Sequence, residues 1–253
     1  MNDLLIDSAD GVMTITLSRL EKKNAFTQDM YQKISEVLNQ SRESVDVRVV
    51  IIQGHETVFS AGNDINDFLG RSPSGVSAVL NFLTSISTFP KPLVAAVCGP
   101  AVGIGTTMLF HFDLIYAGDN AAFSMPFVNL GICPEAGSSY LAPRMMGFPR
   151  AAEALLLGEP FLAESALEMG FINRIVPPRE AASLAQRQAQ KLADKPLGSL
   201  LATKRLMKKG QDSILAERIK AESDTFAMLL QEPAAREAFS AFLEKRKPNF
   251  SKM

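Results

Sequence analysis

The sequence predicts an α/β protein, because short apolar strands alternate with helical segments before "RAAEALLLG". From there on helices dominate, and only "GFINRIVP" still has the pattern of a strand. Of the 253 residues, 47% are hydrophobic and 21% are charged, as in a chain that buries a large core. The 26 Lys and Arg residues nearly balance the 27 Asp and Glu residues, so no net charge attracts nucleic acid or an anionic membrane. A small-molecule partner is expected.

The N-terminal part predicts a hairpin, a helix and a buried strand. Apolar residues alternate over residues 12–17, and Asp10-Gly11 precedes them as a turn. Thr27 is a good N-cap for the amphipathic helix that follows. The apolar run "VRVVIIQG", residues 47–54, then predicts a strand buried on both faces.

The same alternation continues through the middle of the chain. A helix is expected over residues 77–86, a strand in "LVAAVCG", a helix opening near Gly103 and a strand in "DLIYAG". Further helices are expected over residues 150–157, 164–169, 181–194, 197–209 and 214–243, the last interrupted at Pro233. We therefore divide the chain into a core, residues 1–195, and a C-terminal helical region, residues 196–253, which packs on the core or on a neighbouring subunit.

Targeting and membrane signals are weak. Acids occupy Asp3, Asp7 and Asp10, so no secretory or mitochondrial leader is expected. The uncharged stretch over residues 92–112 is broken by glycines and Pro100, which favours a buried strand, turn and helix over a membrane span. The sparse cysteines, Cys98 and Cys133, suggest a reducing compartment, although a single disulfide bridge between them stays open.

Two loops have features of ligand sites. In "HETVFSAGNDINDF" the small residues from Ser60 to Gly62 would let a ligand approach the backbone, although taken alone they favour a structural turn. In "CGPAVGIGTTMLF" the Gly103-Ile104-Gly105 turn enters a helix, so free N–H groups there suit an anion or oxyanion. Met108 replaces the third glycine of a dinucleotide motif, and packing of helix on strand remains the alternative.

Glu135 is the only charged residue between Asp119 and Arg144. Its apolar neighbours are expected to remove water from the carboxylate and raise its pKa, which suits a group that accepts and returns a proton. The alternative is a residue in the first turn of a helix, stabilised by the helix dipole. No serine lies in a G-x-S-x-G elbow, and the two histidines, His55 and His111, are too far apart in the chain to indicate a metal site. We expect a structural, hydrogen-bonded role for His111.

Five segments together resemble the crotonase, or enoyl-CoA hydratase/isomerase, superfamily. They are "KKNAF" (22–26), "FSAGNDI" (59–65), "GPAVGIGTTM" (99–108), "DLIYAGDNAAFSMPF" (113–127) and "LGICPEAGSSY" (130–140). The resemblance implies a ClpP-like spiral of ββα units followed by a helical trimerisation region. It also implies a homotrimer or a dimer of trimers that binds an acyl-CoA substrate.

The resemblance assigns roles to individual positions. The backbone N–H groups of Ala61 and Ile104 would form the oxyanion hole for the thioester oxygen. Substrate contacts would come from Lys23, Asn24, Ala25, Ala61, Gly62, Asn63, Asp64, Ile65, Gly103, Ile104, Phe127 and Leu130. Coenzyme A would be part of the substrate, and no separate cofactor or metal is expected.

Two departures from the superfamily pattern favour one activity. Hydratases use glutamates at the positions that Thr107 and Phe127 occupy here, so efficient hydration is not expected. The remaining acid, Glu135, matches the catalytic base of peroxisomal-type 3-enoyl-CoA isomerases. The resemblance therefore implies conversion of a 3-enoyl-CoA to the 2-trans-enoyl-CoA in fatty-acid β-oxidation.

Other activities of the superfamily stay open as alternatives. They are weak hydration, thioester hydrolysis, dehalogenation and CoA binding without catalysis. Dehalogenases use an aspartate at the position of Glu135 and depend on a tryptophan, which this chain lacks. A bacterial protein of this kind is expected in the cytoplasm, whereas in a eukaryote the C-terminal Ser251-Lys252-Met253 resembles a peroxisomal import signal.

Overall fold

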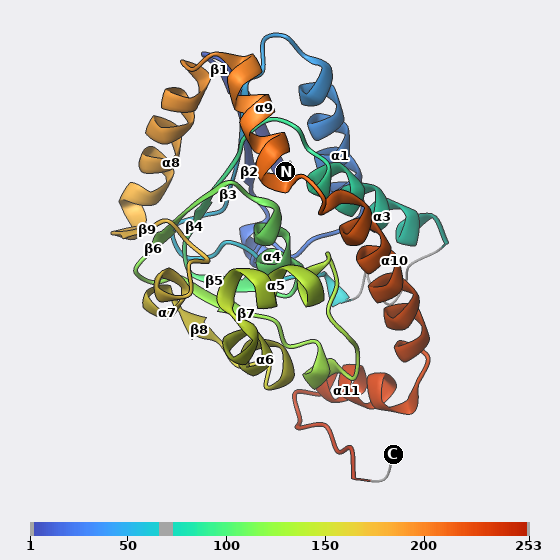
Figure 1. The fold of residues 1–253 in the computed structure, drawn as a ribbon. Helices are drawn as coiled ribbons and strands as arrows, with labels where there is room; N and C mark the ends of the chain where they lie inside the picture. The colour runs from blue at the N-terminus through green and yellow to red at the C-terminus, as the bar shows by residue number, and fades with distance from the viewer. Residues whose placement is uncertain (1–2, 66–72, 252–253) are drawn as a thin grey trace.

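A six-stranded sheet forms the centre of the computed structural model, which describes residues 3–65 and 73–251 (Figure 1). Lys252 and Met253 of the tripeptide considered above lie outside the described residues. The strand order is β1-β2-β3-β4-β6-β9, with β1 and β2 antiparallel and the other neighbours parallel. The strands are β1 (Leu4–Ala9), β2 (Val12–Leu17), β3 (Val49–Gln53), β4 (Leu93–Val97), β6 (Leu114–Gly118) and β9 (Arg174–Val176).

A smaller three-stranded sheet lies beside the first and was not expected from the sequence. Its strands are β5 (Pro100–Val102), β7 (Ala122–Ser124) and β8 (Phe161–Leu162), in the order β5-β7-β8. Strand β5 follows β4 directly, and β7 follows β6 after a short turn. Two passages of the chain, β4–β5 and β6–β7, thus add one strand to the large sheet and one to the small sheet before a helix follows, as in the predicted spiral of ββα units.

Helices cover the large sheet on both faces, as expected for a mostly parallel sheet. α1 (Gln28–Glu43) packs against α3 (Pro73–Ser87), and α8 (Pro178–Ala193) packs against β3, β4 and β6. The predicted cap of α1 is confirmed, since the Met30 N–H donates to the Thr27 Oγ1 at 3.2 Å. The helix predicted after Gly103 is shorter than expected, because α4 (Ile104–Thr107) passes at once into the 3₁₀ helix η2 (Met108–His111).

The remaining elements are short helices. They are η1 (Leu20–Lys22), η3 (Val128–Leu130), α5 (Ser138–Met146), α6 (Phe148–Leu156) and α7 (Ala163–Glu168). Of these, α7 contacts β7 and β8 of the second sheet.

Three C-terminal helices return to the core of the same chain (Figure 1). They are α9 (Leu197–Lys208), α10 (Asp212–Leu229) and α11 (Pro233–Leu243). α10 contacts α5, and α11 contacts η3. The buried Lys204 ties α9 to the core, because its Nζ lies 2.6 Å from Asp113 Oδ2 and 2.7 Å from the Lys91 carbonyl oxygen. Over the ranges that the structure describes, no helix has the length and apolarity to cross a bilayer.

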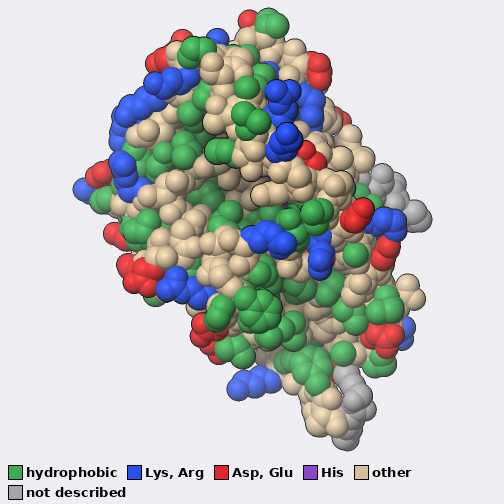
Figure 2. All heavy atoms as spheres, in the orientation of Figure 1, with side chains coloured by type: hydrophobic (Ala, Val, Ile, Leu, Met, Phe, Trp, Pro, Cys, Tyr) green, Lys and Arg blue, Asp and Glu red, His purple; other side chains and the backbone are tan. Residues whose placement is uncertain are grey.

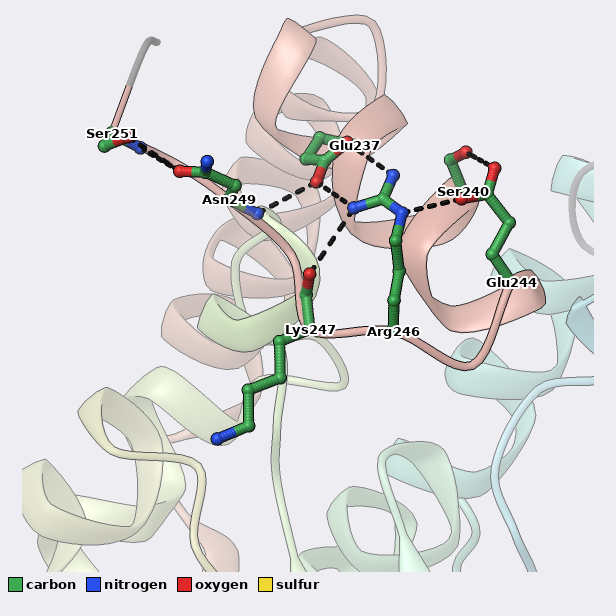
Figure 3. Close-up of polar contacts among 7 residues, drawn as sticks. All are labelled: Glu237, Ser240, Glu244, Arg246, Lys247, Asn249 and Ser251. Carbon is green, nitrogen blue, oxygen red and sulfur yellow. Dashed lines mark hydrogen bonds and ion pairs between the residues drawn. The ribbon is translucent and has the colours of Figure 1, made fainter.

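The chain end beyond α11 is held by a polar network around Arg246 (Figure 3). The Arg246 guanidinium pairs with both carboxylate oxygens of Glu237, at 2.5 and 2.9 Å, and its Nε lies 2.6 Å from Glu244. The Asn249 N–H also donates to Glu237, at 2.9 Å. This network fixes the last turn of α11, which carries Phe242 and Leu243.

Candidate active site

A cavity of about 550 Å³ lies where the loops of the spiral meet the C-terminal helices. Its walls are mostly apolar. The lining residues from the spiral are Lys22, Ala25, Ala61, Gly62, Asn63, Asp64, Ile65, Val102, Gly103, Pro126, Phe127, Asn129, Leu130 and Ile132. Helices α10 and α11 add Phe226, Phe239, Phe242 and Leu243. Figure 2 shows hydrophobic side chains gathering on the molecular surface over α6 and α11.

Most of the predicted substrate-binding residues line this cavity. Those that do are Ala25, Ala61, Gly62, Asn63, Asp64, Ile65, Gly103, Phe127 and Leu130. Lys23, Asn24, Ile104 and Glu135 are not among its lining residues. The aromatic residues of α10 and α11 were expected only as part of the helical region over residues 214–243, because helical spacing alone does not show which residues face a cavity.

The two predicted oxyanion loops lie side by side. Ser60 and Ala101 form a parallel bridge, and the Val102 N–H donates to the Ser60 carbonyl oxygen at 2.9 Å. This pairing brings the residue after Ser60 next to the turn that opens α4. Ile104 is the first residue of α4, so its N–H has no acceptor within the helix. A backbone donor is therefore located where the sequence predicted one.

The other predicted donor, the Ala61 N–H, is hydrogen-bonded to the Lys23 carbonyl oxygen at 2.9 Å. Lys23 and Asn24 both adopt left-handed conformations, with φ of 52° and 54°. Asn24 is fully buried, and its Nδ2 donates to the Phe59 carbonyl oxygen at 3.1 Å. The segment predicted to contact substrate thus packs on the oxyanion loop, and Asn24 supports that loop from behind.

The side chains of Asn63 and Asp64 are already bound by other residues of the protein. The Tyr31 hydroxyl donates to Asn63 Oδ1 at 2.7 Å, and Arg19 Nη1 lies 2.8 Å from Asp64 Oδ2. Because the side chains are engaged in this way, their backbone atoms are the better candidates for ligand contacts.

Glu135 lies in the loop before α5, and its side chain is 7% exposed. The Thr107 Oγ1 donates to Glu135 Oε1 at 3.5 Å, so a neutral side chain contacts this carboxylate. Because α5 begins only at Ser138, the alternative of a first-turn helix residue is wrong. Ala136 and Gly137 that follow are both left-handed, with φ of 61° and 70°. A non-glycine residue in that region costs about 1–3 kcal/mol, so tertiary contacts must hold the loop.

His111 supplies one of these contacts. Its Nε2 lies 2.8 Å from the Ala136 carbonyl oxygen, which only accepts, so Nε2 carries the proton. Burial, reinforced by the nearby Lys208 charge, lowers the pKa of His111 to about 4. The predicted structural role of His111 is confirmed, and the imidazole is neutral at pH 7.

This lowered pKa predicts a pH-dependent stability. In the unfolded chain His111 binds a proton with the ordinary histidine pKa of 6.5, which is above the folded value. The burial of the neutral imidazole therefore makes its full contribution to the free energy of unfolding above pH 6.5. The contribution is lost as the pH falls through about 4 and amounts to about 3 kcal/mol. In urea unfolding at a series of pH values, His111→Gln should show a shallower loss of the free energy of unfolding between pH 6.5 and 4 than wild type. Equal slopes would contradict the assignment.

The two sheets, the apolar cavity and the buried Glu135 are the features with which this chain is compared with known proteins. The family model described as enoyl-CoA hydratase/isomerase matches residues 7–253. The chain is 37% identical over 215 residues to enoyl-CoA delta isomerase 2 of Rattus norvegicus, over 82% of this chain and 55% of that protein. It thus spans about half the length of this relative.

Two further relatives match over almost their whole length. One is 1,2-epoxyphenylacetyl-CoA isomerase of Escherichia coli K12, which is 33% identical over 99% of both chains. The other is the crystal structure of an enoyl-CoA hydratase/isomerase from Pseudoalteromonas atlantica, which matches with a TM-score of 0.95 at 33% identity, over 99% of this chain and 100% of that one. The chain belongs to the enoyl-CoA hydratase/isomerase family, which is the crotonase superfamily predicted from its motifs.

Proposed function

We propose that this protein is an enoyl-CoA isomerase that converts a 3-enoyl-CoA to the 2-trans-enoyl-CoA. The observation that carries the proposal is the buried Glu135, whose carboxylate accepts a hydrogen bond from Thr107. Thr107 is neutral and occupies a position where hydratases have an acid. Asp64 at the cavity is paired with Arg19. A carboxylate that contacts a neutral threonine, at the position where hydratases have their other glutamate, suits a proton shuttle better than hydration.

The reaction needs one base and a site for negative charge. Glu135 would take a proton from C2, which the thioester and the C3–C4 double bond make acidic. The electron pair moves onto the thioester oxygen as a dienolate, and return of the proton at C4 leaves the double bond between C2 and C3. The N–H groups of Ala61 and Ile104 would stabilise the oxyanion, with the thioester oxygen replacing the Lys23 carbonyl as acceptor for Ala61.

The proposal includes the setting of the enzyme. Coenzyme A enters and leaves with the substrate, and no further cofactor takes part. The 2-trans product is the substrate for hydration in fatty-acid β-oxidation, which would give the isomerase its place there. The proposed assembly is a homotrimer or a dimer of trimers, and light scattering on the purified protein would measure it.

Two assays on the wild-type protein test the proposal. The first follows conversion of a trans-3-enoyl-CoA by the absorbance of the conjugated thioester, and the second follows hydration of crotonyl-CoA. Rapid isomerisation with negligible hydration is the expected result. Hydration faster than isomerisation, or no isomerisation, would overturn the proposal and favour another activity of the family.

The cavity wall predicts which substrates are preferred. Phe226 of α10 lines the cavity opposite the spiral loops, so Phe226→Ala should enlarge the acyl site. We expect kcat/KM for long-chain relative to short-chain 3-enoyl-CoA to rise by about 10-fold, which is a typical value for a change of pocket size. Phe148→Ala is the control, because Phe148 is 72% exposed on α6 and lies away from the cavity lining. An unchanged chain-length profile would contradict the assignment of this wall.

A further inference from the structure

A second glutamate, Glu222 of α10, is hydrogen-bonded to the loop that contains Glu135. Glu222 is 6% exposed, and its carboxylate accepts hydrogen bonds from the Gly137 N–H at 2.6 Å and the Ser139 N–H at 2.9 Å. The Ser139 hydroxyl donates to the same carboxylate at 2.5 Å. The three bonds tie α10 to the start of α5, 83 or more residues away in the chain.

The same residue also holds the other side of the loop. The Cys133 thiol donates to the Glu222 carbonyl oxygen, with a sulfur–oxygen distance of 3.6 Å. Glu135 therefore lies between two attachment points, Cys133 and Gly137, that both lead to one residue of α10. Packing reinforces the contact, since a Cβ on Gly137 would lie 2.3 Å from Leu215 Cδ1.

The loop needs such support because its backbone is strained. Ala136 is left-handed at φ 61°, and this conformation persists only where surrounding contacts determine it. His111 fixes the Ala136 carbonyl from the core side, and Glu222 fixes the next N–H from the α10 side. Phe226 lies one helical turn beyond Glu222 and lines the cavity, so one helix both closes the cavity and holds the loop.

We propose that Glu222 is a positioning residue that sets the conformation of the Cys133–Ser139 loop and thereby the place of the Glu135 carboxylate. The consequence for catalysis rests on the proposed function of Glu135. The Gly137 N–H, the Ser139 N–H and the Ser139 hydroxyl all donate to Glu222, so an acceptor-only carboxylate fits them. An amide at this position would turn its NH₂ group toward a donor and leave at least one bond unmade.

The kinetic test compares Glu222→Gln with Glu217→Gln, an exposed glutamate on the same helix. Both are assayed well below their unfolding temperatures. We expect Glu222→Gln to lower kcat for isomerisation by about 100-fold, as a misplaced catalytic group does, while KM stays within about three-fold. Glu217→Gln should match wild type. A Glu222→Gln variant with wild-type kcat, whatever its thermal stability, would overturn the proposal.

A double-mutant cycle tests whether the effect passes through Ser139. Ser139→Ala removes the hydroxyl donor and should lower kcat by about 10-fold, less than Glu222→Gln because two bonds remain. The double variant should be no slower than Glu222→Gln alone, since both changes disrupt one contact. If the losses of kcat in the two single variants multiply in the double variant, Glu222 does not act through Ser139.

Hydrogen exchange separates this proposal from the proposed function. The amides of Gly137 and Ser139 should exchange faster in Glu222→Gln than in wild type, while strand β4 keeps its exchange rate as internal reference. If the wild type does not isomerise 3-enoyl-CoA, the proposed function is wrong. Faster amide exchange in Glu222→Gln would still show that Glu222 holds the loop. If the exchange rates of these two amides are unchanged, Glu222 does not hold the loop, whether or not the enzyme isomerises 3-enoyl-CoA.

Discussion

Glu135→Gln is expected to lower kcat for 3-enoyl-CoA isomerisation by about 1,000-fold, in the middle of the range for loss of a general acid–base group. The amide keeps the size of the side chain and can still accept from Thr107 at Oε1, so the loop and KM should change little. The measurement is steady-state isomerisation by the absorbance of the conjugated thioester.

The matched control for this variant is Glu164→Gln, which changes an exposed glutamate at the start of α7. It should retain wild-type kinetics. If Glu135→Gln keeps a tenth or more of wild-type kcat, Glu135 is a structural residue and the base lies elsewhere.

An isotope experiment on the wild type addresses the same residue. If one carboxylate takes the proton from C2 and returns it at C4, a substrate deuterated at C2 should yield product with part of the label at C4. Complete exchange with solvent under single-turnover conditions would indicate two groups or an open site. Mass spectrometry of the product thioester gives the answer.

Local signals in the sequence predicted the elements that depend on local physics. The Thr27 cap and the buried strand β3 appear where expected, because capping and apolar runs act over a few residues. Strands β5, β7 and β8 were missed, since they are two or three residues long and exist only through pairing with distant segments. The bond from Val102 to Ser60 is of this kind.

The candidate site was predictable in part for the same reason. Small residues marked the loops that contain Ala61 and Ile104, and the lone carboxylate marked Glu135. The roles of Ala61 and Ile104 as oxyanion donors were implied only by the resemblance to the superfamily. Composition does not record that a left-handed turn brings the Lys23 carbonyl to the Ala61 N–H. Nor does it record that Glu222 reaches the Glu135 loop, because that contact depends on how α10 returns to the core.

The junction between β4 and β5 packs against residues 57 and 58, which precede the Ala61 loop, and a substitution there is expected to cause the largest loss of stability. Gly99 is left-handed at φ +63°, and a Cβ there would lie 2.0 Å from the Thr57 carbonyl oxygen and 2.9 Å from the Val58 nitrogen. Both atoms are backbone, so no side chain can rotate away. We expect Gly99→Ala to destabilise the fold by more than about 4 kcal/mol, measured by urea unfolding or seen as failure to fold.

Gly170→Ala separates the two causes of this loss. Gly170 is also left-handed, at φ +74°, but a Cβ there would meet nothing within 4 Å. Its substitution should therefore cost only the conformational penalty, about 1–2 kcal/mol. The excess loss in Gly99→Ala measures the steric clash of the added Cβ with the backbone of residues 57 and 58, which lead through Phe59 to the Ala61 loop. If the two variants lose equal stability, the close packing of Gly99 on residues 57 and 58 does not support the Ala61 loop. The position of the Ala61 N–H would then be set by the Lys23–Asn24 turn.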